Sequence, residues 1–237
     1  MKNLSKKEKK TKKKEVEEVV EEVESSEEIS EEISEDSVDE GEGRQVTLMD
    51  LLGGGANAAN NPEARSIMFV GEVTEDRAAD LISALLVLSQ TKEEDEERAK
   101  PIKLYISTYG GSADEMFGIY DVVNFCKKFC DIETIGLGKV MSAGTLMLAC
   151  GTKGKRKIGK HCRVMIHSVN GGQVGDIHNL QNELEQTVSL QDSYIQALSD
   201  ETHMSKKQIR DLINKKINVY LTAEQAIEKG LADEILE

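Results

Sequence analysis

The sequence predicts an α/β fold in which largely parallel strands alternate with helices. Three observations support this prediction. From about residue 46 onward, short apolar segments typical of buried strands are followed by longer segments with apolar residues at helical spacing. Glycine-rich and asparagine-rich clusters mark a linker-like entry before the first strand, and Gly110-Gly111 marks a sharp turn between a strand and a helix. Strands that alternate with helices in this way are typical of repeated right-handed βαβ units.

The first half of the predicted domain contains two strand–helix pairs. Residues 67–73 form a buried strand, and Thr74 caps the helix that follows. A charged loop at 92–100 leads to an alternating strand at 102–106, which ends at a turn formed by Gly110 and Gly111. The apolar residues on one face of the two helices are Ala78, Leu81, Ile82 and Leu85 in the first and Met116, Ile119, Tyr120 and Val123 in the second.

The second half adds strands at 132–138 and 163–167, with a helix at 142–150 between them. A long polar helix at 176–199 follows. Its apolar side consists of Leu180, Leu184, Val188, Ile195 and Leu198. Residues 222–225 form a capping box that starts a last helix, and Gly230 stops it.

Two segments precede this domain, which we place at 65–237. Residues 1–44 carry nine Lys and Arg and 16 Asp and Glu in separate blocks, and we expect a charged, mostly disordered tail. Four valines between residues 16 and 23 have amphipathic spacing, so a tail that becomes helical on a partner is the alternative. Residues 45–64 are expected to form a linker leading into the domain.

Composition excludes several classes of function. The net charge of −14 and the absence of Trp argue against a function in binding DNA by phosphate neutralisation. No apolar run approaches the roughly 20 residues that span a bilayer, so no membrane segment is expected. Four cysteines are too few for a disulfide framework, and Cys126 and Cys130 look like packed thiols in a helix. Cys162 next to His161 lacks the spacing of a zinc site, so no metal and no cofactor are expected in a reduced, cytoplasmic protein.

Three positions in the α/β pattern could carry chemistry, and each also has a plainer explanation. Gly110 and Gly111 can present backbone N–H groups to a ligand, or simply form a turn. Ser142 lies between a strand and an apolar helix, where a nucleophile gains from the helix dipole, although a capping serine fits equally. His167 ends a buried strand, where it is well placed as a general base, although a purely structural histidine would fit the same position.

In this order the three sites resemble one family. From about residue 67 to 236 the chain resembles the ClpP peptidases, the proteolytic subunits of ATP-dependent Clp proteases. The likeness rests on Tyr109-Gly-Gly-Ser112, Met141-Ser-Ala-Gly144, Gly151-Thr-Lys-Gly-Lys-Arg156, Arg163-Val-Met-Ile-His167, Leu221-Thr-Ala-Glu-Gln-Ala226 and Gly230-Leu-Ala-Asp233.

The resemblance implies a fold, a site and partners. The fold would be the ClpP/crotonase-type α/β spiral, with the helix at 176–199 as its protruding handle. Ser142 would be the nucleophile and His167 its base, and the N–H groups of Gly111 and Ala143 would form the oxyanion hole. The expected activity is that of a serine endopeptidase acting on unfolded polypeptides in a chamber of stacked heptameric rings. An AAA+ unfoldase of the ClpX, ClpA or ClpC type would feed it, since this chain has no Walker motif.

The sequence also departs from the family pattern. Asn218 stands at the acidic position of the triad, and Lys216, Ile217 and Val219 replace charged neighbours that help rings recognise each other. Thr108-Tyr109 replaces the usual Ser-Pro. The first alternative is therefore a catalytically weak or inactive ring subunit with a structural or regulatory role. The second is an acyl-CoA enzyme of the crotonase type, against which the serine–histidine pattern argues.

Overall fold

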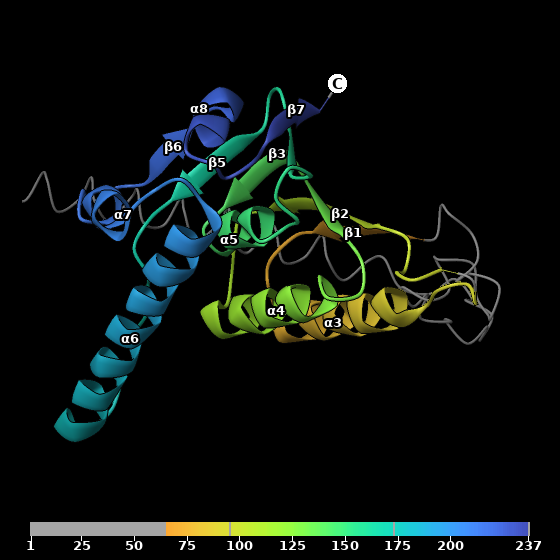
Figure 1. Ribbon diagram of the computed structural model, residues 1–237. Coiled ribbons are helices and arrows are strands. Elements are labelled where there is room, and N and C mark those ends of the chain that lie inside the picture. Colours follow the sequence, from red (N-terminus) through yellow and green to blue (C-terminus); the bar gives the residue numbers. More distant parts are fainter. Residues whose placement is uncertain (1–64, 95, 173, 237) are drawn as a thin grey trace, which may run out of the picture. The chain divides into compact units, whose positions relative to one another are not determined.

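The computed structural model describes residues 65–94, 96–172 and 174–236, and in them seven strands form one sheet (Figure 1). The expectations for residues 1–64 lie outside the described residues. The strands are β1 (Ser66–Val70), β2 (Ile102–Thr108), β3 (Ile132–Met141), β4 (Lys157–Gly159), β5 (Arg163–Ile166), β6 (Val219–Leu221) and β7 (Glu234–Leu236). The helices are α3 (Glu75–Gln90), α4 (Ala113–Cys126), α5 (Ala143–Ala149), α6 (Ile177–Glu201), α7 (Lys206–Ile213) and α8 (Ala223–Glu228).

The sheet is mainly parallel, as the sequence predicts. Its strand order is β1-β2-β3-β4-β7, and every pair along this path is parallel. Strand β3 is long enough to have two partners on the same side. Its middle pairs with β4 through Ile135 and Gly136, and its end pairs with β5 through residues 139–141. Strand β6 then adds to β5 in the antiparallel direction. The end of β3 therefore lies directly beside the end of β5.

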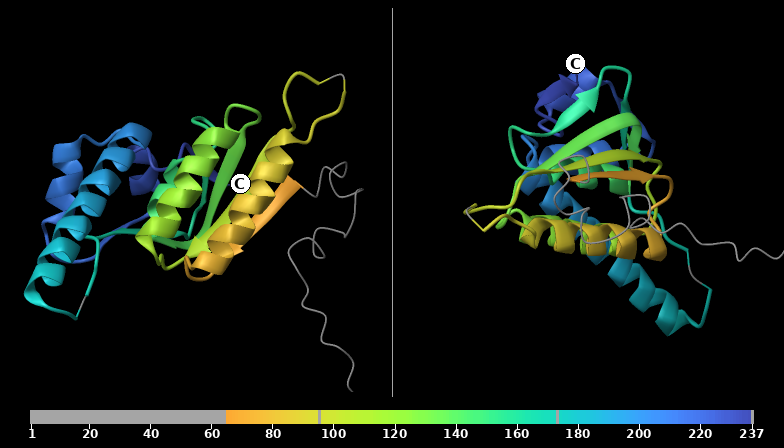
Figure 2. Two further views of the ribbon diagram at one scale, coloured as in Figure 1. Left: turned by 90° about the horizontal axis from the view of Figure 1, so that it is seen from below. Right: turned by 90° about the vertical axis from the view of Figure 1, so that its right-hand side faces the viewer.

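The helices cover the sheet in a way that buries the helix following β3 most deeply. Helices α3 and α4 lie side by side along the β1–β2 part of the sheet (Figures 1 and 2). Helix α5 contacts α4, α6 and three strands, and all seven of its residues are buried. A short helix that is apolar on every side is stable only inside a core. Its first residue is thus held in place by packing on all sides.

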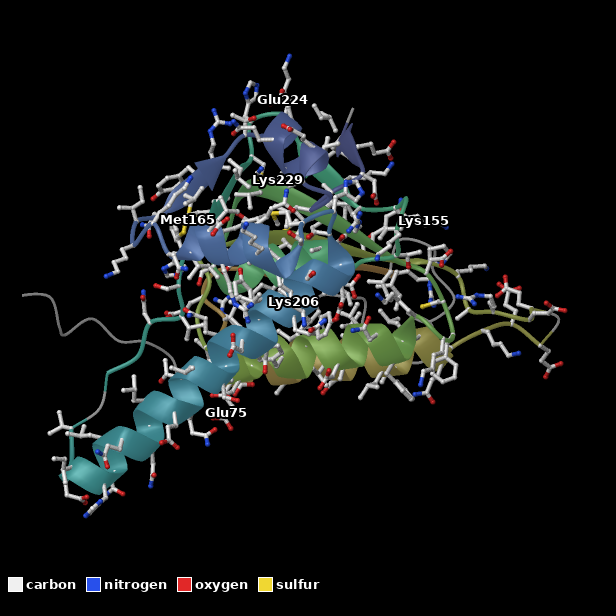
Figure 3. All side chains as sticks on the ribbon, turned by 60° about the vertical axis from the view of Figure 1, so that its left-hand side comes forward. Glu75, Lys155, Met165, Lys206, Glu224 and Lys229 are labelled. Atoms are coloured by element: carbon white, nitrogen blue, oxygen red, sulfur yellow. The ribbon has the colours of Figure 1, made fainter. Side chains whose placement is uncertain are left out.

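Helix α6 has a buried end and an exposed end. Asp176 caps its start by accepting hydrogen bonds from the N–H groups of His178 and Asn179. The buried residues all belong to the last two turns: Tyr194, Ile195, Ala197, Leu198 and Glu201. The earlier turns extend beyond the remainder of the domain with their side chains in solvent (Figures 1 and 3). No helix in the described part of the chain is long and apolar enough to cross a membrane.

The structure corrects several predicted boundaries. The first strand ends at Val70 rather than residue 73, because Gly71 turns the chain and Val73 forms only an isolated bridge to Gly111. The third strand continues past residue 138 to Met141, because Gly138 adopts a positive φ and the register of β2 against β3 shifts there. Cys130 lies beyond the end of α4, although it is fully buried like Cys126. Strands β4, β6 and β7 and helix α7 were not predicted.

Two of the sequence motifs meet in a structural clamp. The Arg156 side chain donates to both carboxylate oxygens of Asp233, at 2.9 Å from Nε and 2.5 Å from Nη2. It also donates to the carbonyls at the ends of α5 and α6, those of Ala149 and Glu201. Burial alone would raise the pKa of Asp233, but the hydrogen bonds from Arg156 outweigh it and hold that pKa below its usual range. Arg156 therefore joins α5, α6 and β7.

We predict that Asp233→Ala lowers the free energy of unfolding by about 3–5 kcal/mol, because it leaves the buried Arg156 charge without a partner. The lowered pKa means that the pair stabilises the fold above the ordinary value of about 3.9 and that this contribution is lost as the pH falls through the lowered pKa. Urea denaturation at fixed protein concentration measures both effects.

Glu234→Ala is the matched control, because its ion pair with Lys157 is exposed and such pairs contribute about 0–1 kcal/mol. Equal losses for the two variants would contradict the assigned role of the clamp.

Candidate active site

Ser142 occupies a strained turn between β3 and α5. Its backbone has φ 54° and ψ −120°, a conformation that is uncommon for a residue with a Cβ and costs on the order of 1–3 kcal/mol. Its N–H donates to the Met165 carbonyl of β5 at 2.8 Å. Its own carbonyl accepts from the N–H of Thr145 at 2.9 Å and from the buried Tyr194 hydroxyl at 3.3 Å. The surrounding elements thus fix the turn.

The turn has a consequence for the serine side chain. Ser142 stands at the N-cap position of α5, but its hydroxyl makes no capping bond to the helix. A nucleophile elbow has this same strained strand-to-helix geometry, which presents the serine Oγ to the site. The conformation is present here although Val140 stands where that motif has its first glycine. The helix-cap explanation of Ser142 is therefore wrong.

His167 lies against the serine. It follows β5 directly, and its Nε2 is 2.7 Å from the Oγ of Ser142. The imidazole is half-buried, and burial lowers its pKa from the ordinary 6.5. The ring is accordingly neutral at neutral pH, with one nitrogen free to accept a proton. The remaining histidines, His161, His178 and His203, are exposed and do not line the site.

The double glycine, Gly110 and Gly111, packs closely against the turn at Ser142 and against Val73. A Cβ on Gly110 would lie 2.6 Å from the Cβ of Ser142, and one on Gly111 would lie 2.3 Å from the Val73 carbonyl oxygen. Only glycine allows these approaches, and both residues have positive φ. The bridge to Val73 uses the Gly110 carbonyl and the Ser112 N–H, so the N–H of Gly111 points to the other side.

The N–H of Ala143 is the first of α5 and has no acceptor within its own helix. Gly111 and Ala143 both line the pocket that contains Ser142. Among the described residues, no protein acceptor is paired with either N–H. The two groups the sequence singled out are thus free to bind an oxygen atom that enters the pocket.

The pocket around the pair has a volume of about 330 Å³ and uncharged walls. No Asp, Glu, Lys or Arg is among the described residues that line it. Those residues are Tyr109, Gly111, Ser112, Ala113, Met116, Phe117, Ser142, Ala143, Met165, His167, Ser168, Val169, Asn170, Leu190 and Tyr194. An imidazolium or an oxyanion formed here would find dipoles but no opposite charge.

Asn218, the predicted third residue, is close to His167 in the sheet, but the described residues show no hydrogen bond between the two. In the register of β5 against β6, Ile166 pairs with Val219, so the next pair along would be His167 with Asn218. The Asn218 side chain is nevertheless exposed, and no hydrogen bond joins it to the imidazole in the described part of the chain. Asp211, another acid near the end of the chain, lies exposed in α7.

The residue that faces the second imidazole nitrogen is one that sequence reasoning missed. Asn170 Nδ2 lies 3.4 Å from His167 Nδ1. Asn170 is in the loop between β5 and α6, where no periodicity distinguishes one polar residue from another. Its position three residues after the histidine is the only signal the sequence holds for it.

The arrangement can carry out one type of chemistry. A hydroxyl that is hydrogen-bonded to a neutral imidazole is an activated nucleophile, and two N–H groups beside it can stabilise a developing oxyanion. These two features together suit acyl transfer. In the residues that the structure describes, no cluster of His, Cys, Asp and Glu could hold a metal ion, and all four cysteines are free and buried.

The fold and the site together define an α/β protein with a serine–histidine pair at a strand-to-helix turn. Comparison with known protein families makes the assignment more specific. The model of the Clp protease family matches residues 59–237, and the chain belongs to this family. The resemblance seen in the sequence is thereby confirmed, and the predicted α/β fold with its mainly parallel sheet is confirmed with it.

We predict that the His167 imidazole titrates with a midpoint below pH 6.5, because burial disfavours its charged form. Since the folded-state pKa is lowered, its neutral form stabilises the fold above about pH 6.5, and this contribution is lost as the pH falls through the lowered pKa. NMR titration of the protein with ¹⁵N-labelled histidine measures the midpoint, and the His167→Gln variant identifies the signal. A midpoint at or above 6.5 would show that the site holds the charged form.

Proposed function

We propose that the chain is a serine endopeptidase of the ClpP type that hydrolyses unfolded polypeptides. The observation that carries the proposal is the 2.7 Å contact between Ser142 Oγ and His167 Nε2 on a strained turn. Membership of the Clp protease family supports the peptidase class.

Each site residue has a role in this mechanism. His167 takes the hydroxyl proton on Nε2 as Ser142 Oγ attacks the substrate carbonyl carbon, and the carbonyl oxygen becomes an oxyanion that the N–H groups of Gly111 and Ala143 stabilise. His167 then gives the proton to the leaving amine as the peptide bond breaks. Water, deprotonated by the same imidazole, attacks the acyl–Ser142 ester; the ester C–O bond breaks, the acid product leaves, and His167 returns the proton to Ser142 Oγ.

The third position separates a fully active enzyme from a weak one. The acid of a serine–histidine triad holds the imidazole in one tautomer and stabilises its cationic form. Asn218 can do only the first of these, and the pocket supplies no carboxylate instead. This uncharged site favours a second candidate, a catalytically weak or inactive ring subunit with a structural or regulatory role.

The proposals for the oligomeric assembly and for the partner protein are supported by the family and by helix α6. We propose stacked heptameric rings in which α6 is the handle, fed by an AAA+ unfoldase of the ClpX, ClpA or ClpC type. The support is an apolar stripe along the exposed turns of α6, since apolar side chains at regular helical spacing are expected to be covered by a partner. Its members are Ile177, Leu180, Leu184 and Val188, which are 40–67% exposed. We propose a cytoplasmic location for this assembly.

Hydrolysis of a fluorogenic peptide tests the function. We expect Ser142→Ala and His167→Ala each to reduce the rate to background, because one removes the nucleophile and the other its base. The matched control is Ser168→Ala, which changes a serine of the same pocket that has no part in the mechanism. Hydrolysis that persists in the Ser142→Ala variant would contradict the proposal.

We further expect Asn218→Asp to raise kcat by about tenfold or more, because the register places position 218 next to His167, and a carboxylate that turns toward the ring there would stabilise the imidazolium. The reverse change costs about 10⁴ in chymotrypsin-type enzymes. Asp211→Ala should leave the rate unchanged, since that acid belongs to α7. An unchanged rate in Asn218→Asp, together with loss of activity in Asp211→Ala, would show that Asn218 is not the third residue of the site.

The assembly is tested by analytical ultracentrifugation at micromolar concentration. We expect the full chain to sediment as paired rings and Leu184→Arg to sediment as single rings, because the charge would interrupt the apolar stripe of α6. Gln186→Arg, at an exposed position off that stripe, is the control. A purely monomeric full chain would refute the ring.

A further inference from the structure

The His167 ring has two hydrogen-bonding nitrogens, and the structure gives each a different neighbour. Nε2 faces Ser142 Oγ at 2.7 Å, and Nδ1 faces the amide nitrogen Nδ2 of Asn170 at 3.4 Å, so the amide must turn by half a rotation before its oxygen faces the ring. These are the two side-chain hydrogen bonds of the imidazole within the described residues. Catalytic hydrogen bonds are often long in unliganded sites and shorten in the substrate complex.

A proton count shows what the Nδ1 neighbour must do. Burial keeps the imidazole neutral at neutral pH, so it holds one N–H proton. If His167 is to take the serine proton, Nε2 must be unprotonated and the single proton must be on Nδ1. An acceptor is then required at Nδ1, and the pocket has no carboxylate to provide it.

Asn170 can supply that acceptor without moving its backbone. The amide carries an oxygen and a nitrogen at nearly equivalent positions, and a half-turn about its last side-chain torsion exchanges them. With the oxygen toward the ring, the amide accepts from Nδ1–H and leaves Nε2 free as a base. With the nitrogen toward the ring, it donates to Nδ1 and places the proton on Nε2, where the histidine is not a base.

We propose that Asn170 is the positioning residue of His167 and that its amide oxygen holds the imidazole in the Nδ1–H tautomer. This inference rests on the proposed function, and it assigns to Asn170 the orienting role that the family pattern would give to Asn218. Both asparagines are exposed, but Asn170 lines the pocket and its side chain is paired with the ring, whereas no hydrogen bond joins Asn218 to the ring in the described part of the chain.

The loop that carries Asn170 is placed by helix α6. A Cβ on the neighbouring Gly171 would lie 3.3 Å from Thr187 Oγ1 of α6, so the loop passes close to this helix. The same helix reaches Ser142 through the Tyr194 hydroxyl. Both the nucleophile and the residue that orients its base are thus positioned against α6.

The tautomer itself provides a test that does not depend on activity. The test is magic-angle spinning NMR at pH 8 on the full chain with ¹⁵N-labelled histidine. The chemical shifts of the two ring nitrogens report which one is protonated. We expect the wild-type His167 to carry its proton on Nδ1 and Asn170→Leu to shift it toward Nε2. Asn218→Leu, the matched control, should leave it on Nδ1. A wild-type ring protonated on Nε2, or a tautomer unchanged in Asn170→Leu, would overturn the inference.

Peptide hydrolysis gives the second readout. Asn170→Leu should lower kcat by about 10–100-fold with little change in KM, less than the roughly 10⁴ seen when a triad holds the wrong tautomer, because a free ring still samples both. Asn170→Asp, which keeps the size of the side chain, should raise kcat above wild type. Normal kcat in Asn170→Leu with loss of kcat in Asn218→Leu would assign the orienting role to Asn218.

The two proposals fail in different ways. Wild-type protein without Ser142-dependent hydrolysis, but with the tautomer shift in Asn170→Leu, would refute the peptidase and retain the positioning role. Hydrolysis that depends on Ser142 but is indifferent to Asn170 would refute the positioning role alone.

Discussion

The strained backbone of Ser142 is the constraint on which the site depends. A residue with a Cβ remains at φ 54° only where its surroundings hold it there. Here β5 accepts its N–H through Met165, and Tyr194 of α6 donates to its carbonyl. Glycine at position 110 leaves the space that its Cβ needs. Sheet, helix α6 and glycine turn therefore together hold the backbone that presents one hydroxyl to one imidazole.

The second property of the site is that no Asp, Glu, Lys or Arg is among the described residues that line it. The Clp protease fold here brings together a hydroxyl, a neutral imidazole and two free N–H groups, but the residues around them are apolar or neutral. Preorganised dipoles aimed at the developing charge stabilise an oxyanion well. They stabilise an imidazolium less well than a carboxylate would, because an amide offers orientation and no charge. Chemistry at this site therefore depends on geometry, and the geometry depends on α6.

Much of this could be predicted from the sequence, for physical reasons. Long segments such as α3, α4 and α6 have a clear 3.6-residue period, and the capping box at Thr222 and Gln225 forms as predicted. Strands β4, β6 and β7 have three residues each, too few to show a period, and they are strands only because longer neighbours pair with them. The end of the third strand was predicted at residue 138 because a glycine is typical of a strand end. In the structure Gly138 instead lies where the register of β2 against β3 shifts, and the strand continues.

Some residues of the site could likewise be predicted from the sequence, and others could not. Ser142, His167 and Gly111 could be found because each lies at the end of a strand, where the chain order of a parallel sheet brings such residues to one edge. Asn170 could not, because its contact with the ring depends on how a loop without periodicity folds back. Asn218 was predicted from the family resemblance alone; it directly precedes β6, next to His167 in the register, and it is exposed.

The central claim is that the strained turn makes Ser142 a nucleophile despite the uncharged site. Reaction of the assembled protein with a fluorophosphonate, followed by mass spectrometry of its peptides, tests this claim directly, because only an activated serine forms the phosphonyl adduct. The account predicts a single adduct on Ser142 that is lost in the His167→Ala variant. Absence of the adduct from assembled protein, or its appearance on another serine, would contradict it.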